Sequence, residues 1–185
     1  MKRSLPRTSA MALSLIAMVV LAGSALAASS FKNASTALSG GNEVPIRDTH
    51  ARGAAHVKLS ADGMSLEYQL VASNIHNVIM AHIHLQAPGT DPGAANGGIV
   101  VWLYPSTAVG PPAAPGGGRH DGILARGTIT AGNLTGVLAG QPLSALVDAI
   151  ESGLAYVNVH TNDGMAPDNT GPGDFPGGEI RGQLP

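Results

Sequence analysis

Residues 54–73, "AAHVKLSADGMSLEYQLVAS", carry the pattern that decides the fold. Small or apolar residues alternate with polar ones over residues 54–60 and again over residues 64–73, which is the period of a half-buried β-strand. Between the two runs, Ala61-Asp62-Gly63 is typical of a tight turn. The stretch therefore predicts a β-hairpin.

Short apolar runs of the same kind recur along the chain, separated by loops in which glycine and proline gather. They are rich in Val, Ile and Tyr, which favour strands. Five further strands are predicted, over residues 77–85, 98–104, 123–130, 154–161 and 178–184. About seven short strands with turn signals between them are typical of a β-sandwich or barrel.

One segment has a helical period instead. In "PLSALVDAIESG", residues 142–153, the apolar residues Leu143, Leu146, Val147 and Ile150 share one helical face, and Gly153 is a suitable C-cap. We expect an all-β fold, an antiparallel β-sandwich of the immunoglobulin-like or superoxide-dismutase-like type, with this one short helix.

The first residues predict export. Lys2, Arg3 and Arg7 precede an uncharged apolar run that ends at Ala27, in the order of a secretory signal peptide. The run is short for a membrane span. We expect residues 1–27 to be removed and residues 28–185 to form one periplasmic or extracellular domain without a membrane anchor.

The amino-acid composition limits the partners and the metal ligands that the chain can use. The formal net charge is −2, and loss of the three basic residues of the leader makes it −5, so nucleic acid is not an expected partner. The chain has no cysteine, which excludes disulfides, thiol catalysis and thiolate metal sites. A metal site would have to use histidine, methionine or carboxylate ligands.

The histidines suggest such a site. His82 and His84 alternate in "AHIHLQAPG", residues 81–89, so both point to one face of the predicted strand, together with Met80. His160 lies in another predicted strand, and the three imidazoles converge if the two strands are neighbours. Imidazole suits copper and zinc, and a thioether from Met80, or from Met165 in the loop after His160, would favour copper.

Other interpretations of these residues stay open. Buried histidines are often structural and satisfy hydrogen bonds in the core. His50, His56, His76 and His120 lie at predicted strand edges or in loops, where a solvated imidazole is the usual state. The carboxylates Asp163, Asp168 and Asp174 lack the spacing of an EF-hand and predict a solvated loop. Glu179 and Arg181 share a strand face, and we expect a structural ion pair, either between the two or with charges on a neighbouring strand; Arg181 could also support a loop at the histidine site.

Six blocks together resemble the CHRD domain, the module named from chordin and common in bacterial secreted proteins. They are "ALSGGNEVP", "DGMSLEYQL", "AHIHLQAPG", "GGIVVWL", "AYVNVHT" and "GGEIRGQL", and they extend from about Ala37 to Leu184. The resemblance implies a secreted β-sandwich, in animals a module of a growth-factor antagonist. Gln86 and Ile46 depart from the residues common in similar proteins, Gly and Pro respectively.

Two functions are compatible with these features. The first is a secreted or periplasmic metal-binding protein, with copper as the expected ion and zinc as the alternative. The second is a non-catalytic extracellular domain that binds a protein or a glycan. A redox enzyme is less favoured: the His-x-His pair with a distant third histidine is similar to the copper ligands of copper-zinc superoxide dismutase, but no zinc subsite is evident. No catalytic residues are predicted, because no nucleophile motif is present.

Overall fold

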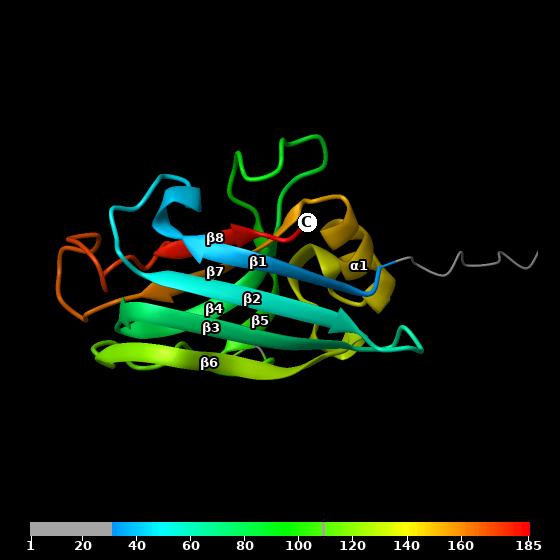
Figure 1. Ribbon diagram of the computed structural model, residues 1–185, viewed down its shortest axis with the longest axis horizontal. Helices are drawn as coiled ribbons and strands as arrows, with labels where there is room; N and C mark the ends of the chain where they lie inside the picture. The colour runs from blue at the N-terminus through cyan, green and yellow to red at the C-terminus, as the bar shows by residue number, and fades with distance from the viewer. Residues whose placement is uncertain (1–30, 109) are drawn as a thin grey trace, which may run out of the picture.

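The computed structural model describes residues 31–108 and 110–185, and within them eight strands and one α-helix (Figure 1). The predicted signal peptide, residues 1–27, lies outside the described residues. The strands are β1 (Asn33–Ser39), β2 (Arg52–Leu59), β3 (Leu66–His76), β4 (Val78–Leu85), β5 (Gly98–Tyr104), β6 (Arg119–Ile129), β7 (Ala155–Thr161) and β8 (Ile180–Gln183), and the helix is α1 (Leu143–Glu151).

The strands form one antiparallel sheet in the order β5-β4-β7-β8-β1-β2-β3-β6. The sheet bends until its edge regions approach each other: the Tyr68 hydroxyl on β3 donates a hydrogen bond to the carbonyl of Leu103 on β5, at 2.7 Å. In Figure 1 strands β1, β2, β3 and β6 lie in front of β4 and β5. The sandwich-like, all-β architecture with one helix is confirmed.

The strand β1 was not among the predicted strands. Its sequence, "NASTALS", consists mostly of small and polar residues that have little intrinsic preference for β structure. It pairs with β2 along its whole length and buries Ala34 and Leu38. Tertiary pairing therefore outweighs local propensity at this position. Strand β6 also begins earlier than expected, at Arg119 rather than at residue 123.

The hydrophobic core lies between the two halves of the bent sheet. Val157 and Val159 on β7 are fully buried within it, on the strand face opposite to the one that carries His160. Helix α1 adds Leu146, Val147 and Ile150. Its apolar face follows the predicted period, and the chain leaves the helix through Gly153, whose φ of 68° favours glycine.

Strand β7 is buried on both faces. Its second face carries Tyr156, Asn158 and His160, which are polar and still inaccessible to solvent. Loops of residues 40–51, 86–97 and 162–179 cover this face and contact one another or β8; the Arg47 guanidinium, for example, donates to the carbonyl of Gly178. The sheet therefore encloses an apolar core on one side of β7 and a polar centre on the other.

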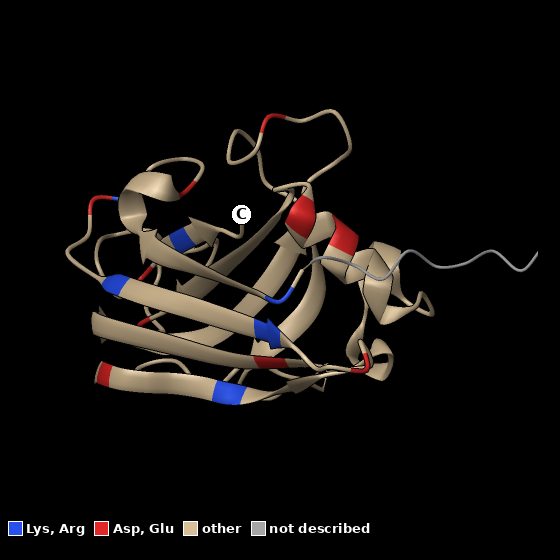
Figure 2. Cartoon of the chain, turned by 45° about the vertical axis from the view of Figure 1, so that its right-hand side comes forward, with Lys and Arg blue, Asp and Glu red and all other residues tan. Residues whose placement is uncertain are grey.

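The surface carries few charges. Figure 2 shows Lys and Arg scattered over several strands and loops rather than gathered on one face. Arg119 and Asp121, at the start of β6, form an exposed ion pair at 2.6 Å. None of the helices in the described part of the chain is long and apolar enough to cross a membrane.

Candidate metal centre

Strands β4 and β7 are neighbours in the sheet, and their register brings the three predicted histidines together. Met80 lies opposite His160, and His82 lies opposite Asn158. Because side chains alternate between the faces of a strand, His82, His84 and His160 all project into the polar centre. The condition that the sequence left open, that the two strands are adjacent, is fulfilled.

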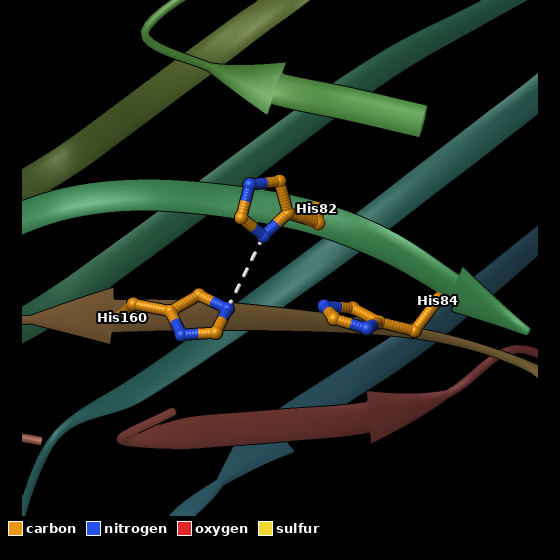
Figure 3. Close-up of side chains that lie close together, drawn as sticks. All are labelled: His82, His84 and His160. Atoms are coloured by element: carbon orange, nitrogen blue, oxygen red, sulfur yellow. Dashed lines mark hydrogen bonds between the residues drawn. The ribbon is translucent and has the colours of Figure 1, made fainter. Parts of the chain in front are cut away.

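The three imidazole rings lie close together, with the His82 and His160 rings joined by a short nitrogen–nitrogen contact (Figure 3). Nδ1 of His82 lies 3.2 Å from Nε2 of His160. One nitrogen of each ring lies within 4.8 Å of one nitrogen of each of the others. Two nitrogens bound to one tetrahedral ion at ~2.0–2.1 Å would be about 3.3 Å apart. The first pair already has this spacing, and the third ring needs to move by less than roughly 1.5 Å.

Two of the rings are fixed by backbone carbonyls on their outer side. Nδ1 of His84 donates to the carbonyl of Gly97 at 2.9 Å, and Nδ1 of His160 donates to the carbonyl of Pro176 at 2.8 Å. A carbonyl only accepts, so both Nδ1 atoms donate; Nε2 of the neutral His84 ring keeps its lone pair, whereas Nε2 of His160 also faces an acceptor, the amide oxygen of Asn158 at 2.9 Å. Metal-binding histidines commonly have this arrangement, because the outer hydrogen bond orients the ligand nitrogen.

Burial keeps the rings neutral. The exposed fractions of His82, His84 and His160 are 0%, 7% and 5%. Loss of solvent lowers the pKa of His82 to about 2 and that of His160 to about 4, and it lowers the pKa of His84 as well. A neighbouring histidine or arginine lowers the pKa of each ring further, because its positive charge opposes protonation of the ring. Neutral imidazoles are the form that binds metals.

Two nitrogens of this group have no hydrogen-bond partner. They are Nε2 of His82 and Nε2 of His84, and both are buried. A buried polar atom without a partner costs about 1–3 kcal/mol. An ion bound at the centre would give the His84 lone pair a partner. The chemistry of the donor set therefore fits a metal.

Arg181 and Tyr156 support the ring of His84. The Tyr156 ring stacks on His84 with an interplanar angle of 9°, and the Arg181 guanidinium lies over the Tyr156 ring, 3.5 Å from its centroid. The Tyr156 hydroxyl accepts the N–H of Gly97, whose carbonyl holds His84. A side chain at position 97 would collide with the carbonyl of Leu85. These contacts fix the loop of residues 86–97 against the centre.

Glu179 and Arg181 have separate partners and form no ion pair with each other. The Glu179 carboxylate accepts the hydroxyls of Thr49 and Thr161 and the N–H of Gly173. Arg181 donates to oxygen atoms of Ala95, Asn96 and Gln183. Both side chains are buried and connect the covering loops to β8.

The two candidate methionines differ in position. Met80 is half-buried on the face that carries His82, opposite His160. Met165 is 67% exposed in the loop after His160. The three histidines are the group of potential metal ligands that the described residues contain; the loop carboxylates Asp163, Asp168 and Asp174 form no such group.

Sequence reasoning missed two residues beside the centre. Trp102 on β5 pairs with His82, and the two ring centroids are 4.4 Å apart. Glu43 lies in the loop between β1 and β2 and is buried. The alternation of β5 could have placed Trp102 on this face, but no local signal connects Glu43 with histidines so distant in sequence.

Comparison with known proteins gives one family. The family model of the CHRD domain matches residues 34–184, a range that contains all three histidines and every strand except the first residue of β1. No curated protein and no solved structure matches the chain.

Proposed function

Because the chain belongs to the CHRD domain family and its sheet encloses three histidines, we propose that it is an exported protein that binds one metal ion, copper in preference to zinc. The observation that supports it best is the convergence of His82, His84 and His160, in which Nε2 of His84 is buried without a hydrogen-bond partner. The carbonyls of Gly97 and Pro176 already orient two of the ligands.

Copper is the proposed ion for two reasons. Sites made of nitrogen ligands bind Cu(II) more tightly than Zn(II). Met80, half-buried on the same face, adds a thioether that favours Cu(I). Because the centre is almost closed to solvent, it suits storage, delivery or protection better than turnover of a substrate. Among residues 31–108 and 110–185 no second metal-ligand group accompanies it, so the proposal does not include a two-metal dismutase.

Titration with metal salts tests the proposal directly. The chain has a single tryptophan, Trp102, whose ring contacts His82. We expect Cu(II) to quench its fluorescence, whereas Zn(II) should bind without strong quenching. At a hundredfold excess over the dissociation constant, an ion that binds only the folded state stabilises it by about 2.7 kcal/mol. For a domain of this size that amounts to roughly 5–10 °C in the melting temperature.

Single variants locate the site. His82→Ala, His84→Ala and His160→Ala should each lose most of the metal-dependent shift. His56→Ala, an exposed residue of β2, should keep it. If the parent responds to neither copper nor zinc, or if the three variants respond like the parent, the metal function is wrong. The family resemblance then favours a non-catalytic domain that binds an extracellular protein or a glycan.

Export is tested separately. Mass spectrometry of the protein from its native envelope should give an N-terminus near Ala28. Recovery of the intact chain from Met1 as the main species would contradict removal of the leader.

A further inference from the structure

Glu43 is a buried carboxyl group that no hydrogen bond fully satisfies. It follows the short 3-10 turn η1 (Gly40–Asn42), and its backbone N–H donates to the carbonyl of Gly40. The side chain is 3% exposed, and its Oε1 has no hydrogen-bond partner. A carboxyl group is rarely buried in this way without a function or a partner.

The Glu43 side chain lies against β7 and the start of β8. A Cβ at Gly178 would lie 2.5 Å from Oε1 of Glu43 and 2.9 Å from Nδ2 of Asn158. Gly178 has a φ of 120°, a conformation that glycine adopts easily. The absence of a side chain at this position therefore leaves room for Glu43 to approach Asn158.

Asn158 connects Glu43 with the metal centre. Its Oδ1 lies 2.9 Å from Nε2 of His160, the nitrogen that faces His82, while its Nδ2 is on the side of Glu43. One amide side chain thus separates the carboxyl group from a proposed ligand.

The other charges near Glu43 are positive. Burial raises the pKa of the Glu43 carboxyl group to about 7, and the positive charges of Arg181 and Arg47 partly oppose this rise. Above that pH the carboxylate balances the buried Arg181 guanidinium. A cation held by three neutral imidazoles would otherwise add to a centre that is already positive, and buried charge without compensation is costly.

We propose that Glu43 is the counter-charge of the three-histidine centre: through Asn158, its carboxylate offsets the charge of the bound ion and makes the site prefer divalent over monovalent cations. This inference rests on the proposed metal function. It makes Glu43 a positioning and selectivity residue that does not itself ligate the ion.

The loss of affinity expected on removal of the Glu43 charge depends on the charge of the bound ion. Residues that support metal ligands from outside typically contribute tenfold to a hundredfold in affinity. Coulomb energy is proportional to the charge of the ion. Glu43→Gln should therefore weaken Zn(II) binding by about 10- to 100-fold and Ag(I) binding by only roughly 3- to 10-fold.

Isothermal titration of the mature protein with Zn(II) and with Ag(I) at pH 8, where Glu43 is ionised, measures both affinities. Glu67→Gln removes an exposed carboxylate on β3 and is the matched control, which should bind both ions like the parent. Arg47→Gln removes a positive charge that faces Glu43, and it should tighten Zn(II) binding several-fold. Circular dichroism in EDTA checks that each variant is folded.

The outcomes separate this inference from the metal function. A parent that binds neither ion overturns both. A parent that binds Zn(II), together with a folded Glu43→Gln variant that binds it equally well or loses equal factors for both ions, overturns the role of Glu43 alone. If Glu43→Gln does not fold, Arg47→Gln decides: tighter Zn(II) binding supports the counter-charge, and unchanged or weaker binding overturns it.

Discussion

The metal-free protein should lose stability in mild acid, because its centre buries neutral histidines. Burial lowers the pKa of His82 to about 2 and that of His160 to about 4. In the unfolded chain both groups titrate near pH ~6.5. Below that pH the unfolded chain binds protons that the folded protein does not bind, so the free energy of unfolding falls as the pH falls.

The expected loss can be worked out for the interval from pH 6.5 to pH 5. If the unfolded chain binds one proton more than the folded protein, the free energy of unfolding falls by roughly 1.4 kcal/mol for each pH unit of acidification. Because the unfolded histidines are only half protonated at the upper limit, His82 and His160 together cost about 3 kcal/mol. His84, whose pKa is also lowered, adds to this loss.

Glu43 acts in the opposite direction. Its pKa is raised from 4.5 to about 7, so between these values the folded protein holds a proton that the unfolded chain has released. The folded state gains about 2 kcal/mol from this group as the pH falls from 6.5 to 5. The net loss from Glu43, His82 and His160 is therefore between about 1 and 2 kcal/mol, and Glu43→Gln should raise it to about 3 kcal/mol.

Urea unfolding in EDTA, followed by circular dichroism at pH 6.5 and pH 5, measures these differences. Glu67→Gln, which removes an exposed carboxylate, should behave like the parent. A parent that is equally stable or more stable at pH 5 would show that the histidines are not buried as neutral rings. Identical losses in the parent and in Glu43→Gln would show that the carboxyl group is not protonated in the folded state.

Two further predictions concern the two faces of β7. Val159→Asp should prevent folding, because it places an unpaired carboxylate in the core; soluble protein with a native circular dichroism spectrum would contradict the assigned face of β7. Tyr156→Phe should destabilise the fold by about 1–3 kcal/mol, because it leaves the Gly97 N–H without its acceptor. It should also weaken metal binding by roughly tenfold or more through the loosened His84, and unchanged values in both urea unfolding and metal titration would refute that support.

Strand periodicity predicted most of the fold. The apolar alternation around Val157 and Val159 depends on the residues of one strand alone, so it could be read locally. The strand β1 could not be predicted in this way, because Ala34 and Leu38 are its only strongly buried apolar residues. It forms a strand because it pairs with β2. Small polar residues become a strand there only when a partner supplies the hydrogen bonds.

The candidate site was predictable where it followed a strand and not where it followed a loop. His82 and His84 share a face by alternation, and one assumption about neighbouring strands brought in His160. Glu43 reaches the centre only because the loop between β1 and β2 folds across β8, where Asn42 donates to the carbonyl of Arg181. The period of the side chains carries no information about such a crossing. For the same reason it could not tell that Glu179 and Arg181, which share a strand face, have separate partners in the covering loops and do not pair with each other.

The three ligands and the groups that orient them belong to different kinds of backbone. The histidines are part of the paired strands β4 and β7, whereas Gly97 and Pro176 lie in loops, and loops open locally at lower free energy than core strands. An ion would then exchange with solvent through opening of a loop while the strands stay intact. Residence time therefore depends on more than affinity: opening of the loops sets how fast an ion leaves, whereas the tightness of binding depends on the strand histidines together with the loop groups that support them, Glu43 included.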